Sequence, residues 1–355
     1  MRRNVEEHPR RAWTLLHALC PVKHTHSLTA VRAASMFAPV EAALYPGLLA
    51  LGCAAMMDAW VRLPSAWHPV AWFGRLAQWL IDRAPTAPPK RAFCWGLVLA
   101  LGLPACATLV IGWLLRSAFP WHALMFALHV IVLYACVCLF GLLHAAERLG
   151  AALEQGLAEA RKQLSWLCSR DPSELDEPEL INGAVESLAE NLSDSVVAPL
   201  FYLCVGGLPC AVLYRAVNTL DAMIGYRGRF EWLGKASARF DDALNFVPAR
   251  LTALLLLVAA ASCGRSRRLS LARGVRVWRA DRARTPSPNG GHPMAMAAGL
   301  LGLRLDKPES YVLGEGLPAP TRADLPRALT LTHRAGLLSL VLAAAICVWR
   351  GGRLV

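Results

Sequence analysis

The sequence predicts an all-α, polytopic integral membrane protein with about four to six transmembrane helices. Of its 355 residues, 55% are apolar and only 17% are charged, which is more apolar than an ordinary globular protein. Segments 92–115 and 121–146 contain no Lys, Arg, Asp or Glu. Each is long enough to cross about 30 Å of hydrocarbon, so both are predicted spans.

Further apolar segments give a weaker signal. Segments 39–57 and 333–349 are shorter or carry an ionisable residue near one end, where it can snorkel to the interface, and we predict that both cross. Segment 196–217 is interrupted by a Gly-Gly-x-Pro sequence and 251–263 is short, so each is a broken or partial span, with 218–250 linking them. Irregular backbone at membrane depth needs protein or water around it, so the break indicates either a site or a kink packed by neighbours.

The predicted organisation is a basic N-terminal extension, residues 1–38, followed by one membrane-embedded catalytic domain, residues 39–350. Polar segments 58–91, 147–195 and 264–332 separate the spans. The last of these is rich in arginine and directly follows an apolar segment, so the positive-inside rule places it on the cytoplasmic face, which all three share if six segments cross.

An amphipathic helix is expected after the second span. Residues 145–167 are rich in Ala, Leu, Glu and Arg, with apolar residues at helical spacing. Two prolines and several acidic residues in 171–179 should end it. We expect it to be a solvated connector.

Composition argues against nucleic-acid binding, a zinc site and a disulfide framework. The net charge of +12 does not indicate nucleic acid, because many of the cations lie in the predicted juxtamembrane segment. The eleven cysteines form no CxxC pair and mostly lie in apolar runs, so neither a zinc site nor a disulfide framework is indicated.

The strongest candidate site begins at Asn182, in NGAVESLAENLSDSVVAPLF. In a helix, Glu186, Glu190 and Asp194 lie at successive i, i+4 positions, with Asn191 beside them. Carboxylates this close at a membrane edge call for a cation: Mg²⁺, a substrate amine, or an arginine of the chain itself. The alternative is an ordinary solvated acidic face.

Two later strings repeat this pattern of Asp and Asn. In RAVNTLDAMIGYRGRF, Arg215, Asn218 and Asp221 share one helical face. In ARFDDALNFVPAR, Asp241 and Asp242 lie four and three residues before Asn245, and the string ends at Arg250. Asp and Asn are poor residues for a helix interior, so a function would explain them. The alternative is that they cap helices and bind one another.

Two loop motifs complete the set. His68 precedes Pro69 in a predicted interfacial loop, where it suits a general base or a phosphate contact, or is merely a loop residue. The Gly-rich string TPSPNGGHPMAMAAG holds Asn289 and His292 before a small-residue helix, and such a turn can present N–H groups to phosphate. The sequence has no P-loop, so bound ATP would be held in another way.

Five strings, in this order, are similar to the adenosylcobinamide-phosphate synthase family of cobalamin biosynthesis, CbiB or CobD. They are HPVAWFGRL, ENLSDSVVAPLFY, AVNTLDAMIGYR, DDALNFVPARLTA and TPSPNGGHPMAMAAG. The resemblance covers about residues 45–350. Two departures are Arg62-Leu63-Pro64, where the family commonly has Gly-Asp-Pro, and Met294, where many members have Glu.

This resemblance implies a multi-pass enzyme of the bacterial inner membrane. It would join aminopropanol, or its O-phosphate, to a propionate carboxyl of adenosylcobyric acid, using ATP and Mg²⁺. The implied partners are the corrinoid, the aminopropanol compound, the lipid bilayer and other enzymes of the cobalamin pathway.

Roles for the candidate residues follow as hypotheses. The expected catalytic residues are Glu190, Asp194, His68 and Asp241. The expected substrate- and phosphate-binding residues are Asn191, Asn218, Arg250, Asn289 and His292. The expected metal ligands are Asp221, Asp242 and Glu186.

Two other function classes stay open on the sequence alone. A transporter would also place polar residues beside a Gly/Pro-broken segment, although its two halves would normally carry matching breaks. A membrane scaffold would recruit soluble corrinoid enzymes through the basic segment 264–332.

Overall fold

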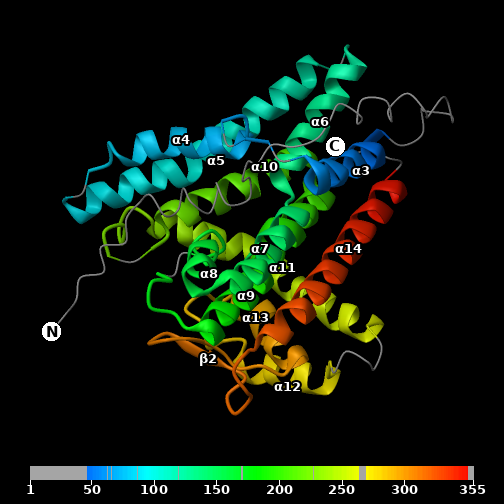
Figure 1. Cartoon of the computed structure of the whole chain (residues 1–355). Coiled ribbons are helices and arrows are strands. Elements are labelled where there is room, and N and C mark those ends of the chain that lie inside the picture. Colours follow the sequence, from blue (N-terminus) through cyan, green and yellow to red (C-terminus); the bar gives the residue numbers. More distant parts are fainter. Residues whose placement is uncertain are drawn as a thin grey trace.

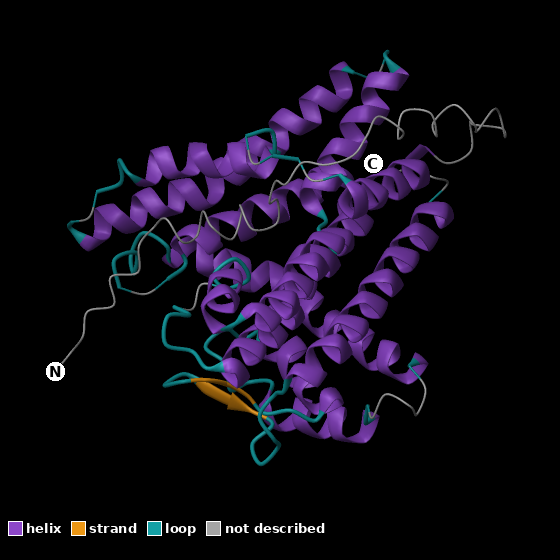
Figure 2. Ribbon diagram, in the orientation of Figure 1, coloured by secondary structure: helices purple, strands orange, loops and turns teal. Residues whose placement is uncertain are grey.

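The computed structural model describes residues 46–61, 63–64, 66–85, 87–118, 120–168, 171–226, 228–263 and 269–350. The predicted extension 1–38 lies outside these residues, as does Arg62 of the first departure from the family pattern. The described part is almost entirely helical and carries one small β-hairpin (Figure 2).

The helices are α3 (Pro46–Trp60), α4 (Pro69–Ile81), α5 (Pro89–Ser117), α6 (His122–Cys136), α7 (Phe140–Gln155), α8 (Leu157–Leu164), α9 (Glu177–Leu192), α10 (Ala198–Ile224), α11 (Lys235–Ser262), α12 (Leu271–Asp281), α13 (Gly291–Leu301) and α14 (Leu325–Trp349). A π-helical turn, η1 (Ser193–Val197), joins α9 to α10, and a 3-10 turn, η3 (Arg322–Asp324), precedes α14. Strands β1 (Leu305–Lys307) and β2 (Tyr311–Leu313) pair antiparallel, with Leu305 opposite Leu313.

Four helical stretches of the described residues are long and apolar enough to cross a membrane. They are Pro89–Ser117, Glu177–Ile224, Lys235–Ser262 and Arg322–Trp349. The bent pair α6 and α7 makes a fifth if it counts as one span, and α3 is a shorter apolar helix. The prediction of an all-α polytopic membrane protein is confirmed.

The predicted span 121–146 is divided in the structure. Helices α6 and α7 are bent by 41° at a short break, where the N–H of Cys138 donates to the carbonyl of Ser195 at 2.8 Å. Helix α7 then continues to Gly156, whose φ of 127° ends it. The predicted span is therefore bent between α6 and α7, and the helix predicted over 145–167 is divided at Gly156 between the end of α7 and α8.

The predicted break in 196–217 is present, and the predicted link is not. Gly206 and Gly207 have non-helical backbone angles inside α10, and Gly207 has a φ of 74°. Segment 251–263, in contrast, is only the end of the 28-residue α11. Most of 218–250 therefore belongs to the end of α10 and the first half of α11. Its polar residues lie on the same two helices as the apolar segments.

The predicted polar segments also contain helices. Segment 58–91 holds α4, 147–195 holds α8 and α9, and 264–332 holds α12, α13 and the hairpin. Asp176 begins α9, since its side chain accepts from the N–H of Glu179 at 2.9 Å while the Glu179 carboxylate accepts from the N–H of Asp176 at 2.8 Å. The cytoplasmic placement of these segments stays a prediction.

Helix α9 is the centre of the described structure. It packs against α7, α8, α13 and α14, and Figure 1 shows it among them. Its residues from Leu180 to Ala189 are all buried, because apolar side chains occupy most of its circumference. Glu186, in the middle of this run, is thereby held inside the protein.

A second, smaller core holds the far end of α10. Leu220 and Ile224 of α10 pack with Ala77 of α4, Leu99 of α5 and Leu233 of the following turn. Figure 1 shows α4 and α5 lying along this end of α10. This packing fixes the position of Asp221 and the start of α11.

Two glycines of α5 test this packing. A Cβ at Gly96 would lie 1.9 Å from the carbonyl oxygen of Leu233, whereas one at Gly102 would meet nothing within 4 Å. Gly96→Ala should therefore lower the free energy of unfolding by about 1–3 kcal/mol. Gly102→Ala should be neutral or stabilising, because alanine is the better helix former. Thermal unfolding in detergent measures both, and equal melting temperatures would contradict the close approach of α5 to Leu233.

Candidate functional site

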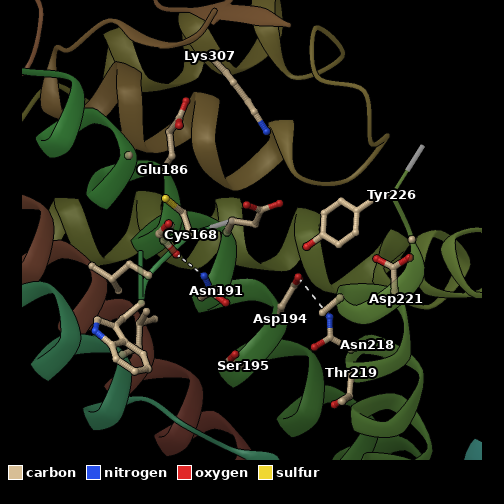
Figure 3. A pocket seen from close by; sticks show the side chains of 18 of the residues that line it. Cys168, Glu186, Asn191, Asp194, Ser195, Asn218, Thr219, Asp221, Tyr226 and Lys307 are labelled. Carbon is tan, nitrogen blue, oxygen red and sulfur yellow. Dashed lines mark hydrogen bonds between the residues drawn. The ribbon is translucent and has the colours of Figure 1, made fainter. Parts of the chain in front are cut away.

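Two adjoining cavities of about 350 and 820 Å³ lie where α9, η1, α10, α11 and the hairpin meet. Glu190, Asp194, Asp221 and Lys307 line both, so we treat the two as one site, the carboxylate cavity. Figure 3 shows Asp194, Asn218 and Asp221 along one wall. The residues of the three predicted strings are thus brought together although they are far apart in the sequence.

The π-helical turn places Asp194. It adds a residue to the helical turn between α9 and α10, so Asp194 is rotated from the straight i, i+4 line through Glu186 and Glu190. Glu186 and Asn191 line only the smaller cavity, whereas Glu190 and Asp194 line both. The three carboxylates nevertheless line the smaller cavity together, as their predicted shared face requires, although the helix does not continue with α-helical geometry beyond Leu192.

Two amide side chains hold the carboxylates. The amide nitrogen of Asn218 donates to Oδ2 of Asp194 and to Oδ1 of Asp241, both at 3.4 Å. The Asn245 amide donates to Oδ2 of Asp241 at 2.9 Å and accepts from the buried hydroxyl of Tyr214 at 2.9 Å. The alternative that the Asp and Asn residues bind one another is therefore correct in part. These hydrogen bonds fix the orientation of Asp194 and Asp241.

Arg215 supports this network from behind. Its guanidinium donates to Oδ1 of Asn218 and to Oγ of Ser195, each at 3.4 Å. It makes no ion pair within 4.0 Å among the described residues. Arg215, one of the cations that could neutralise the cluster, therefore forms no ion pair with its carboxylates in the described part of the structure.

The cluster has an excess of negative charge. Among the described residues, no Lys, Arg or His lies within 4.0 Å of a carboxylate oxygen of Glu190, Asp194, Asp221 or Asp241. Oδ1 of Asp221 is buried without a hydrogen-bond partner. Because a buried charge without a partner is costly, this cavity favours a cation.

The donor set suits Mg²⁺ shared with phosphate rather than a metal held by protein alone. No three His, Cys, Asp or Glu side chains of the described residues are grouped closely enough to form a complete metal site. Mg²⁺ commonly takes one or two carboxylates and completes its octahedron with water and phosphate oxygens. A Cβ at Gly225 would lie 2.1 Å from Oδ1 of Asp221, so the glycine leaves room beside that oxygen.

The Gly-rich loop forms another wall of the larger cavity. Ser287 donates to Oδ1 of Asp242 at 3.1 Å, and the Asn289 amide donates to the carbonyl of Asp242 at 2.7 Å. A Cβ at Gly290 would be 3.4 Å from Oε1 of Glu190, so the loop and the start of α13 face the carboxylates closely. The loop and the acidic strings therefore line one cavity, and phosphate binding by the loop stays a prediction.

Lys307 was not predicted from the sequence as a site residue. It lies at the end of β1, and Figure 3 shows its amine directed toward the cavity from the side opposite Asp194. The hairpin is held by Asn182, whose amide donates to the carbonyl of Asp306 at 2.6 Å and accepts from its N–H at 3.2 Å. Tyr226 and Tyr311 also line both cavities and were not predicted.

Three predicted residues line neither cavity: His68, Arg250 and His292. Arg250 lies behind the Gly-rich loop, and its guanidinium donates to Oδ1 of Asn289, which lines the larger cavity, at 3.2 Å. His292 accepts a hydrogen bond from Nε1 of Trp278 at 3.2 Å, on the same outer side. Their catalytic and binding roles stay predictions.

His68 lies at the N-terminal end of α4, with its ring centroid 5.4 Å from that of Tyr134. Burial, and secondly the charge of Arg215, lower the pKa of His68 to about 4. Its imidazole is therefore neutral at pH 7.

This shift predicts a dependence of stability on pH. Between its ordinary pKa of 6.5 and about 4, His68 binds a proton in the unfolded chain but not in the folded one, so stability falls as the pH falls through that window. His68→Gln should therefore lose less melting temperature than the wild type between pH 7 and pH 5. The exposed His122→Gln is the control, and identical pH profiles for all three proteins would contradict the buried neutral imidazole.

The chain matches the family model described as CobD/Cbib protein over residues 51–340. The cobalamin biosynthesis protein CobD of Dehalococcoides mccartyi is 38% identical over 289 residues, covering 81% of this chain and 89% of that protein. CobD of Chromobacterium violaceum is 40% identical over 317 residues, covering 84% and 97%. CbiB of Salmonella typhimurium is 36% identical over 294 residues, covering 80% and 89%. No solved structure matches the chain. The chain therefore belongs to the CobD/CbiB family of cobalamin biosynthesis proteins.

Proposed function

We propose that this protein forms the amide between a propionate carboxyl of adenosylcobyric acid and aminopropanol or its O-phosphate, with ATP and Mg²⁺. Membership of the family supports the corrinoid pathway. The observation that carries the reaction type is the cluster of Glu190, Asp194, Asp221 and Asp241 along the adjoining cavities, which faces Lys307 and a Gly-rich loop. This arrangement suits a metal-bridged phosphate group beside a site for an amine.

Amide formation from a carboxylate needs two kinds of help. A propionate is a poor electrophile until its oxygen becomes a leaving group, and ATP bound with Mg²⁺ supplies that activation by phosphorylation. The amine must also lose a proton before its nitrogen can attack the carbonyl carbon. Both needs are met by groups of the kind that line the carboxylate cavity.

The carboxylates would hold the metal. Asp221 offers a buried oxygen without a hydrogen-bond partner, and Asp194 lies on the same wall. One or two carboxylates with phosphate oxygens complete the usual coordination of Mg²⁺. Asn218 and Asn245 keep Asp194 and Asp241 oriented before any ligand arrives, which reduces the cost of ordering the site.

The positive groups of the cavity would bind phosphate oxygens. Lys307 reaches in from the hairpin, and Lys235 and Arg239 of α11 line the larger cavity. Ser287 and Asn289 add hydroxyl and amide groups from the loop. A remaining carboxylate, Glu190 or Asp241, can accept the proton from the substrate ammonium after attracting it into the cavity.

A direct assay separates this proposal from transport and scaffolding. The purified, lipid-reconstituted protein is incubated with adenosylcobyric acid, ATP, Mg²⁺ and either aminopropanol or its phosphate. Mass spectrometry should show a corrinoid that has gained the aminopropanol arm and lost one water. An unchanged corrinoid under all conditions would contradict the proposal. The Gly206–Gly207 break lines neither cavity, so nothing specific favours a transporter.

Single amide substitutions test the carboxylates. Glu190→Gln, Asp194→Asn and Asp241→Asn should each lower the turnover number by at least about a hundredfold, because the metal loses a charged ligand or the amine loses its base. Glu147→Gln, at an exposed position of α7, is the matched control and should retain full activity. Normal turnover in all three cavity variants, with folding intact, would contradict the roles proposed for these carboxylates.

Lys307 has its own test. Lys307→Gln should raise the KM for the phosphate-bearing substrate or ATP by about tenfold, since one charge-assisted hydrogen bond is lost. Lys307→Arg should restore part of the affinity. Arg304→Gln, at the position just before β1, is the control, because its exposed ion pair with Asp306 contributes little. Equal KM values for Lys307→Gln and Arg304→Gln would show that the amine of Lys307 does not bind substrate.

A further inference from the structure

A separate groove of about 540 Å³ opens on the outer side of α11, between that helix, α12 and α13. Its wall includes Arg250 and Leu254 of α11, Trp278 of α12, Arg282 and His292. It shares no lining residue with the carboxylate cavity. The substrate chemistry proposed above does not use it.

Two guanidinium groups meet in this groove without an acid. Arg250 stacks on the ring of Phe246 at 3.6 Å, and Arg282 lies over the ring of Trp278 at 5.1 Å. Each also donates to a backbone carbonyl of its own neighbourhood. Neither makes an ion pair within 4.0 Å among the described residues, and the two groups repel each other. An anion between them would remove that repulsion.

The neighbouring imidazole leaves this positive charge unchanged. Burial, and then the charges of Arg250 and Arg282, lower the pKa of His292 to about 4, so its ring is neutral at pH 7. The indole N–H of Trp278 donates to Nδ1 of His292, so the ring proton is on Nε2. The groove therefore presents two fixed cations and further N–H donors, a set suited to phosphate oxygens.

The rest of the groove is apolar and continues onto a membrane-spanning helix. Leu254 and Val258 of α11 are 54% and 47% exposed, on a helix long and apolar enough to cross a bilayer. Helix α12 is amphipathic, with Val275 and Trp278 toward the groove and Arg276 and Arg279 exposed. Such a basic, Trp-containing helix is typical of the membrane interface.

We propose that this groove binds the headgroup phosphate of an anionic phospholipid, with the acyl chains along the exposed leucine and valine side chains of α11. The arginine pair supplies charge complementarity to the phosphate, and the adjoining apolar surface distinguishes a lipid from a free anion. An anionic lipid suits the groove better than a zwitterionic one, because no carboxylate of the described residues lines the groove to receive a headgroup amine.

Native mass spectrometry of the detergent-purified chain tests the proposal. The protein is titrated with phosphatidylglycerol, phosphatidylcholine or inorganic phosphate. The wild type should bind phosphatidylglycerol in preference to phosphatidylcholine. Arg282→Gln should weaken that binding by about tenfold. Arg279→Gln, which removes an exposed arginine of the same helix, should bind as the wild type does.

A second variant separates loss of the site from loss of folding. Leu254→Trp fills the groove and keeps both arginines, so it should also lose phosphatidylglycerol, while thermal unfolding reports whether each variant is folded. Equal affinity in Arg282→Gln and Arg279→Gln would overturn the site, as would equal wild-type affinity for the two lipids. Displacement of phosphatidylglycerol by millimolar inorganic phosphate would identify a soluble-anion site and contradict the lipid.

Discussion

The structure depends on keeping several carboxylates together along two adjoining cavities. Glu190, Asp194, Asp221 and Asp241 come from four helical elements and line adjoining cavities. Amide groups orient two of them, but amides do not cancel charge. Like charges held together without a counter-ion lower the free energy of unfolding, so packing elsewhere in the fold must offset this loss. The large apolar core around α9 supplies that gain.

The same packing that stabilises the fold also positions the site. Helix α9 is buried on all sides from Leu180 to Ala189, and this fixes where Glu190, at the end of that stretch, enters the cavity. Asn182, one turn earlier, fixes the hairpin and hence brings Lys307 over the carboxylates. The small core around Leu220 holds the end of α10 in place. Packing and site are therefore coupled: a change in the core is expected to alter the spacing of the charged groups.

Sequence patterns predicted the parts that depend on local spacing. Asp241 and Asn245, four residues apart, do form a hydrogen bond, and the apolar segments do form long helices. Features that depend on tertiary contact were missed. The π-helical turn before α10 coincides with a hydrogen bond from Cys138 to Ser195, and Lys307 reaches the cavity only through the docking of its hairpin. Spacing along one helix cannot show such contacts.

The central claim is that the carboxylates of the cavity require a cation that arrives with phosphate. The most direct measurement is the melting temperature of the wild type and of Asp221→Asn, each with and without Mg²⁺ and ATP. Mg²⁺ with ATP should raise the wild-type melting temperature by several degrees. Without ligand, Asp221→Asn should melt at a higher temperature than the wild type. On addition of Mg²⁺ and ATP, its melting temperature should rise much less than that of the wild type. A wild type unaffected by Mg²⁺ and ATP, or a ligand-free Asp221→Asn that melts lower, would contradict the account.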